Sequence, residues 1–402
     1  MSSLLISQVI FRMSITKKYQ NPEYLLLVMS FVMPLVFSVW MVLLNNFVVE
    51  KAHFTGKEIG ILQSLREIPG FLAFTAIYVL LLLKEQTFAL LALALTCLGV
   101  ALTGMFPSNA GLYLTTVIMS TGFHYFETMS QSLTLQWIKK EHAAHFMGRM
   151  LAVKSAGSLL AFISIWILMK EFAWSYQATY LAFGCLALLL TIAMAWYFPS
   201  FATPTEQTKK LLFRKQYSLY YALTFFSGAR RQIFVVFAGF LMVEKFHYSV
   251  ANISALFLIN YVFNWFFAAK LGKLIGIIGE RRVLHLEYIG LIALFIGYAL
   301  VSNGKVAAVL YVIDHLLFAF TIAIKTYFQK IALPEDIAAS AGVSFSINHV
   351  AAVVIPVLFG LVWVQNNAAV FYLGAGFAFC SLVLSFLVPK QPVMILKPEN
   401  SA

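Results

Sequence analysis

The chain has 402 residues, of which 61% are hydrophobic, 16% are aromatic and only 11% are charged, and its mean hydropathy is +0.85. These values exclude an ordinary soluble domain and indicate an integral membrane protein. The formal net charge is +12. Most of this positive charge comes from basic residues near the predicted helix ends, where it indicates orientation in the membrane, so nucleic acid is not predicted as a partner.

The first 24 residues contain only a short apolar run and no cleavage site of small residues, so we expect a cytoplasmic N-terminal arm. After them, apolar stretches of about 20 residues, the length that crosses a bilayer as a helix, recur along the chain. Continuous rather than alternating apolarity favours helices over a β-barrel. The sequence therefore predicts an all-α integral membrane protein with twelve transmembrane helices, over residues 25–48, 59–83, 87–106, 111–138, 148–170, 176–198, 217–243, 250–269, 282–302, 307–330, 338–364 and 369–388.

Lysine and arginine near the helix ends indicate the orientation. Eighteen of them fall in the N-terminal arm, the even-numbered loops and the tail, whereas five fall in the other loops. Because basic residues accumulate on the cytoplasmic side, both termini are predicted to be cytoplasmic. The short loops indicate a prokaryotic inner, or plasma, membrane.

The sequence also repeats itself. VVEKAHFT, at residues 48–55, recurs as MVEKFHYS at residues 242–249, and each copy follows the first helix of a six-helix half. We interpret both copies as structural turns, and Thr55 with Glu58 has the spacing of a capping box. The repeat predicts two pseudo-symmetric halves. The expected divisions are an arm (1–24), a first half (25–198), a linker (199–216), a second half (217–388) and a cytoplasmic tail (389–402).

With this pattern of twelve predicted helices in two similar halves, the chain resembles the major facilitator superfamily of secondary transporters over nearly its whole length. The loop motif of that family resembles GKLIGIIGERRVL, in which Gly272, Gly279 and Arg281 match, while Gly276 replaces the acidic position and Glu280 a basic one. The resemblance implies a gating loop here. It also implies a monomer, and a central cavity between the halves where substrate binds near the midplane.

Polar side chains follow one face of two predicted helices. Ser120, His124, Glu127 and Gln131 occupy steps of four, three and four, and Asp314, Phe318, Thr321 and Lys325 repeat these steps 194 residues later. Ionisable groups that face lipid are costly, so each stripe should face a wet cavity or a protein partner. We predict that His124, Gln131, Thr321 and Lys154 contact substrate.

Arg230 and Arg231 lie inside an apolar run, near the middle of the bilayer. Arginine stays charged and its planar fork matches carboxylate or phosphate oxygens, so the pair is predicted to bind an anion. Neighbouring residues point about 100° apart on a helix, so one arginine should face the cavity and the other a neighbouring helix. Glu127 and Asp314 are the predicted proton-coupling groups, because a cavity that opens to alternate sides can load and release their protons.

Structural interpretations stand beside these functional ones. The two arginines with Glu127, Lys154 with Glu127, and Arg66 with Glu67 could each be ion pairs that only hold helices together. Lys325 could extend to the cytoplasmic interface.

Enzymatic activity is not expected. The cluster EHAAH, at residues 141–145, has no further metal ligands nearby, and no phosphate-binding glycine-rich loop exists, so neither a metal nor a cofactor is predicted. The sequence favours a proton-coupled transporter of a small organic anion or zwitterion. Proton-driven efflux of drugs or other amphipathic compounds is the alternative, and a membrane sensor or scaffold that does not transport is a third possibility.

Overall fold

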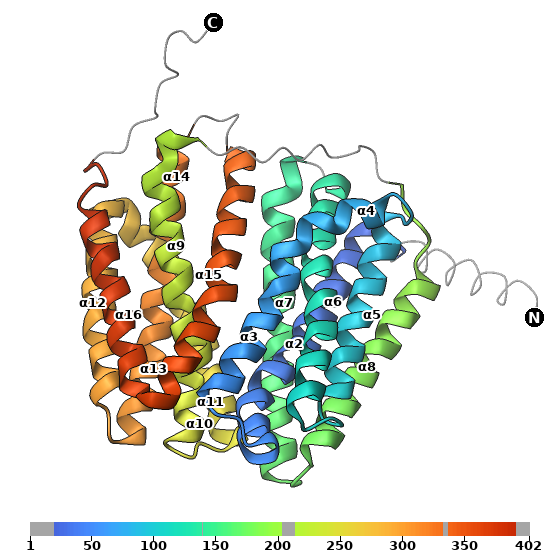
Figure 1. Cartoon of the computed structure of the whole chain (residues 1–402). Helices are drawn as coiled ribbons and strands as arrows, with labels where there is room; N and C mark the ends of the chain where they lie inside the picture. The colour runs from blue at the N-terminus through green and yellow to red at the C-terminus, as the bar shows by residue number, and fades with distance from the viewer. Residues whose placement is uncertain (1–19, 139, 203–213, 333–336, 391–402) are drawn as a thin grey trace, which may run out of the picture. The chain divides into compact units, whose positions relative to one another are not determined.

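The computed structural model describes residues 20–138, 140–202, 214–332 and 337–390. Within these residues the chain is helical and contains no strand. Each of the twelve predicted stretches is helical over most of its length (Figure 1). Their continuous apolar composition explains this, because in lipid a helix satisfies its own backbone groups.

The packing divides the chain into two units. Of the described residues, the first unit contains those within 20–43 and 72–202, and the second contains those within 44–71 and 214–390. The long helix α2 (Pro22–Ala52) contributes to both. Residues 44–71 pack with the second unit, although their place in the sequence lies in the predicted first half.

The first unit contains four further long helices. They are α5 (Glu85–Thr103), α6 (Asn109–Trp137), α7 (Lys140–Lys170) and α8 (Tyr176–Tyr197), preceded by a 3₁₀ turn over Leu72–Thr75 and the short α4 (Ala76–Leu80). Helix α5 packs between α6 and α8. Gly157 of α7 lies against the backbone of Phe31 in α2, where a Cβ would come within 2.5 Å of the Phe31 carbonyl oxygen.

The second unit begins with α3 (Gly56–Phe71), and most of its helices come from the second half of the chain. After a 3₁₀ turn over Lys215–Tyr217, its other helices are α9 (Ser218–Gln232), α10 (Gly239–Glu244), α11 (Val250–Ile278), α12 (Glu280–Leu300), α13 (Gly304–Phe318), α14 (Ile322–Ile331), α15 (Ile337–Gln365) and α16 (Asn367–Ser385). Helix α3 packs along α15, and α9 packs against α15 and α16. Helix α12 packs against α13 and α16.

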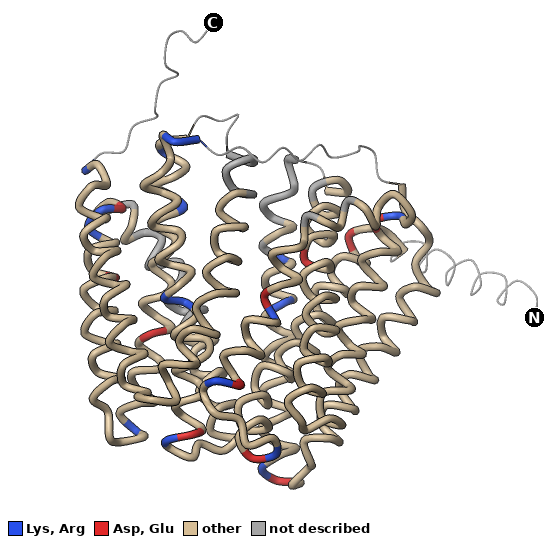
Figure 2. Tube along the Cα trace, viewed as in Figure 1, with Lys and Arg blue, Asp and Glu red and all other residues tan. Residues whose placement is uncertain are grey.

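Nine helical stretches of the described residues are long and apolar enough to cross a membrane. The other three predicted spans correspond to α3 with α4, to α6 and to α11. Large apolar side chains such as Leu189, Trp196 and Leu300 are exposed on the helices, as expected of surfaces that face lipid. Figure 2 shows that many of the charged residues lie toward the helix ends and that few lie along the helix middles.

Both copies of the repeat form turns, as predicted. Thr55 donates its backbone N–H to Glu58 at 2.9 Å, and the Thr55 hydroxyl also hydrogen-bonds that carboxylate, which confirms the capping box. His53 and His247, at equivalent positions of the two copies, both have left-handed backbones, with φ of 54° and 55°. The two copies of the repeat thus end their helices in the same way.

Candidate functional site

Two helices of the second unit change their winding next to predicted site residues. After Arg231, α9 gives way to a π-helix over Ile233–Ala238, which continues into α10. After Phe318, α13 gives way to a 3₁₀ turn over Ala319–Thr321, which continues into α14. π-Helical segments are rare in proteins, and those that occur are often found at functional sites. Because π- and 3₁₀-helices differ from an α-helix in residues per turn, each interruption changes the direction of the side chains that follow it.

Arg230 is buried against α12. It is only 4% exposed, and its Nη1 atom lies 3.6 Å from Glu287 Oε1. The guanidinium also lies over the ring of Tyr288, with 4.5 Å between Cζ and the ring centroid, and its Nε donates to the Phe226 carbonyl at 3.2 Å. Arg230 therefore has a carboxylate and an aromatic partner within its own unit.

Arg231 points elsewhere. Its side chain is exposed, and its Cζ lies 5.9 Å from the centroid of the Phe318 ring. No carboxylate in the described part of the chain lies within ion-pair distance of it. The expectation that the two arginines diverge, one toward a neighbouring helix, is confirmed by the pair of Arg230 with Glu287.

Asp314 of α13 is 2% exposed and forms no ion pair with any described residue. Its Oδ2 atom is buried and accepts no hydrogen bond from the described part of the chain. Thr321, at the 3₁₀ turn, donates its hydroxyl to the Phe318 carbonyl at 2.6 Å and lies close to the Glu287 carboxylate. Asp314 and both arginines line one small cavity, whose full lining is Ser227, Arg230, Arg231, Phe234, Glu287, Leu291, Phe295, Asp314 and Phe318.

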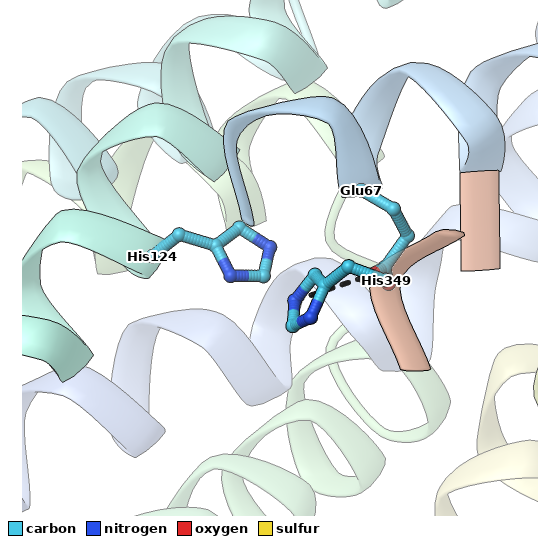
Figure 3. A group of neighbouring side chains, drawn as sticks. All are labelled: Glu67, His124 and His349. Carbon is cyan, nitrogen blue, oxygen red and sulfur yellow. Dashed lines mark ion pairs between the residues drawn. The ribbon is translucent and has the colours of Figure 1, made fainter. Parts of the chain in front are cut away.

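A second buried charge cluster joins α3 to α15. Arg66 pairs with Glu67 and donates from Nε to Gln63 Oε1 at 2.7 Å. Figure 3 shows the ion pair between Glu67 and His349, whose Oε2 and Nε2 atoms are 3.7 Å apart. The charge of Glu67 also attracts Arg231. Because Glu67 already has two partners, it does not neutralise Arg231 as Glu287 neutralises Arg230.

The first unit carries the other predicted site residues on α6 and α7. Lys154 Nζ lies 3.0 Å from Glu127 Oε1 and 3.1 Å from Oε2, so the pair anticipated from sequence is present. His124 is buried and Gln131 is exposed. The expected meeting of this stripe with the arginines stays a prediction.

The predicted gating loop is shorter than expected. Helix α11 continues past residue 269 to Ile278, so Gly272 lies within it, and α12 begins at Glu280. Gly279 alone separates them, with φ of +82°. Arg281 lies over the Phe386 ring at 5.9 Å. The side chains of the EHAAH segment, residues 141–145, lie outside the described ones.

Sequence reasoning missed Glu287. It lies five residues into a predicted helix and close to Arg281 and Arg282, so it resembles an interfacial charge. A signal was nevertheless present, since Glu280 and Glu287 are seven residues apart and thus share a face of the helix. Both are buried, and Glu280 pairs with Lys330 at 2.6 Å.

Comparison with known proteins identifies the family. The sequence model of the Major Facilitator Superfamily matches residues 26–356. The chain belongs to the major facilitator superfamily. As expected of a secondary transporter, it is thus a non-enzymatic membrane protein that acts on a small-molecule substrate.

Solved structures of this superfamily share the fold. The nucleoside transporter NupG, in a single-substitution variant, is 16% identical, with a TM-score of 0.74, over 92% of this chain and 99% of that one. A bacterial homologue of the human lysosomal transporter Spinster, in an inward-facing and occupied conformation, is 13% identical, with a TM-score of 0.69, over 91% and 96% of the two chains. No curated protein sequence matches the chain. At these identities the likeness extends to the fold alone.

Proposed function

We propose that this transporter moves a small organic anion or zwitterion across the inner membrane by alternating access, coupled to protons, as a monomer with both termini in the cytoplasm. The observation that carries the proposal is the contrast between the two arginines. Arg230 is buried with Glu287, whereas Arg231 is exposed at the same cavity and has no paired carboxylate among the described residues. Arg231 is therefore the cation that an incoming anion can bind.

The surroundings of Arg231 indicate the kind of anion. A guanidinium binds carboxylate or phosphate oxygens through two parallel hydrogen bonds. Phe234, Phe295 and Phe318 line the cavity beside it, and these rings favour an apolar or aromatic body next to the anionic group. Thr321 adds a polar contact. On the first unit, His124, Gln131 and Lys154 are the residues that we propose to contact substrate.

Proton coupling belongs to the same proposal, with Glu127 and Asp314 as its carboxyl groups. Asp314 is buried at the cavity, and Glu127 is part-exposed beside Lys154. A carboxyl group at a cavity that opens to alternate sides can take up a proton on one side and release it on the other.

The test is a thermal-shift screen of the purified transporter against organic anions, zwitterions, neutral sugars and lipophilic cations. A ligand that binds only the folded protein raises the melting temperature. Anions should stabilise the protein, and Arg231→Gln should weaken their binding by about 10- to 100-fold, because a charge-assisted hydrogen bond contributes about 1.5–3 kcal/mol. Arg231→Lys retains the charge and should lose less. Anion binding that is unchanged in Arg231→Gln would overturn the proposal.

Export of lipophilic cations is the second candidate function. The phenylalanine lining and the two buried carboxyl groups, Glu287 and Asp314, favour it, since cation exporters use acidic and aromatic walls. It predicts stabilisation by lipophilic cations that Arg231→Gln leaves unchanged. A flux assay in proteoliposomes separates both candidates from a sensor or scaffold, which would move no substrate.

A further inference from the structure

The cavity wall of the second unit holds three buried charged groups that do not balance one another. Arg230, Glu287 and Asp314 are 4%, 1% and 2% exposed and come from α9, α12 and α13. Arg230 pairs with Glu287 at 3.6 Å, and its charge also reaches Asp314. One permanent cation therefore serves two carboxyl groups.

Among the residues that the structure describes, the other ionisable groups around this set do not supply a second buried cation. Arg231 lies on the same wall, but its side chain is exposed and does not add a buried cation. Arg66, Glu67 and His349, from α3 and α15, interact among themselves. The remaining groups near the three are the phenols of Tyr288 and Tyr298 on α12 and of Tyr311 on α13, and the imidazole of His315 on α13.

A buried carboxylate without a compensating cation costs several kcal/mol, and such a group takes up a proton instead. Two carboxyl groups beside one cation release that proton as a pair. We infer that Glu287 and Asp314 share one exchangeable proton beside Arg230, and that this pair is the proton-carrying site of the transporter. This inference rests on the proposed function and adds Glu287, which no sequence pattern assigned.

Glu127 does not have this property. Both of its carboxylate oxygens lie within 3.1 Å of Lys154 Nζ, and its side chain is 39% exposed. Glu127 thus has its own cation partner and access to water, unlike the buried carboxyl groups beside Arg230. The shared proton is therefore assigned to Glu287 and Asp314, which adds Glu287 to the proposed coupling groups.

The location of the proton also gives the sign of coupling. When the pair is protonated, Arg230, Glu287 and Asp314 together are neutral, and when the proton leaves they carry one negative charge. That negative charge repels an anion at Arg231, on the same cavity. Because coupling between two ligands is reciprocal, the bound anion also favours the proton. Anion and proton thus bind together, as symport requires.

Infrared spectroscopy of the purified protein without substrate tests the shared proton. Near neutral pH, the carbonyl stretching band of a protonated carboxyl group should be present. It should disappear in Asp314→Asn and also in Glu287→Gln, because either change leaves one carboxylate with Arg230. Asp314→Glu should retain it, and so should the control Glu171→Gln, a change at an exposed carboxylate that pairs with Lys170. The inference is overturned if the band is absent from the unchanged protein, or if it survives both amide substitutions in variants that remain monodisperse.

Benzoate binding between pH 6 and 8 tests the coupling, since benzoate joins a carboxylate to an aromatic body and stays ionised throughout this range. Its affinity should fall by up to about tenfold per pH unit where the pair loses its proton. In Asp314→Asn it should not change with pH. Arg231-dependent binding that is flat with pH in the unchanged protein would overturn the inference and leave the anion site intact. No benzoate binding at any pH would overturn the proposed anion site, while the infrared band would still decide the shared proton.

Discussion

Arg66 with Glu67 and Lys154 with Glu127 are ion pairs of the same chemistry in different surroundings. The Arg66 and Glu67 side chains are each 9% exposed, whereas those of Lys154 and Glu127 are 29% and 39% exposed. Exposed pairs contribute about 0–1 kcal/mol, because water screens both charges. Breaking a buried pair costs about 3–5 kcal/mol, because the remaining charge stays buried.

We therefore expect Glu67→Gln to lower the free energy of unfolding by about 3–5 kcal/mol. The matched control, Glu127→Gln, should lower it by less than about 1 kcal/mol. Thermal unfolding of both variants in the same detergent measures the difference. Equal and small losses would mean that the cluster on α3 and α15 contributes little to stability.

At the scale of elements, the repeat VVEKAHFT and MVEKFHYS specifies one turn twice. His53 and His247 both have left-handed backbones. The residue after each histidine donates its backbone N–H to the carbonyl six residues earlier, from Phe54 to Val48 and from Tyr248 to Met242, both at 3.0 Å. A Cβ disfavours this backbone, whereas glycine adopts it without strain. Both copies thus adopt a left-handed backbone at the same position although histidine carries a Cβ.

His247→Gly should raise the free energy of unfolding by up to about 1 kcal/mol, since it removes that strain. Greater freedom of glycine in the unfolded chain makes this an upper limit. His247→Ala keeps the Cβ and should bring no such gain. Thermal unfolding of the two variants checks the prediction, which fails if alanine stabilises as much as glycine.

The contact of α3 with α15 depends on small residues. A Cβ on Gly60 would come 2.3 Å from the Pro356 carbonyl oxygen, and one on Gly360 would come 2.4 Å from the Gly56 carbonyl oxygen. Helix backbones approach this closely only where side chains are absent, as is common between membrane helices. Glycine at residue 60 therefore sets the distance between the two helices.

Gly60→Val should separate α3 from α15 and cost at least about 1–3 kcal/mol of stability, the usual penalty of overpacking. The control is Gly376→Val in α16, where a Cβ would meet no atom within 4 Å. Melting temperatures of both variants, measured side by side, give the comparison. A loss at residue 376 as large as that at residue 60 would show that the effect belongs to valine and not to the helix contact.

At the scale of the whole molecule, features that depend on composition and period were predictable from the sequence. The lengths of the apolar runs located the helices, and the repeat located the equivalent turns at His53 and His247. Features that depend on packing were not. The π-helix over Ile233–Ala238 and the 3₁₀ turn over Ala319–Thr321 contain no proline or glycine that could signal a break.

The candidate site shows the same limit. Two arginines in an apolar run are a signal in themselves, because their charge cannot be removed by deprotonation. Their division into a paired and an exposed side chain depends on Glu287, which reaches Arg230 from another helix. A single sequence does not reveal that Arg230 and Glu287 form an ion pair, because the contact depends on how α9 and α12 pack.

Orientation in the membrane is the prediction that concerns the whole chain. With twelve spans and a cytoplasmic N-terminus, Ser108 and Ser175 fall outside the cell, while Lys84 and Lys390 fall inside. Lys84, Ser108 and Ser175 directly precede α5, α6 and α8, and Lys390 follows the end of α16. Single cysteines there, in a chain whose Cys97, Cys185 and Cys380 are replaced by alanine, report their side through a membrane-impermeant maleimide.

Ser108→Cys and Ser175→Cys should be labelled in intact cells, and Lys84→Cys and Lys390→Cys only after permeabilisation. The reverse pattern would mean that the asymmetry of basic residues does not orient this chain. Labelling of Ser108→Cys and Ser175→Cys from opposite sides would instead require an odd number of crossings between them, contrary to the two that α6 and α7 provide. The experiment thus separates an error in orientation from an error in the number of spans.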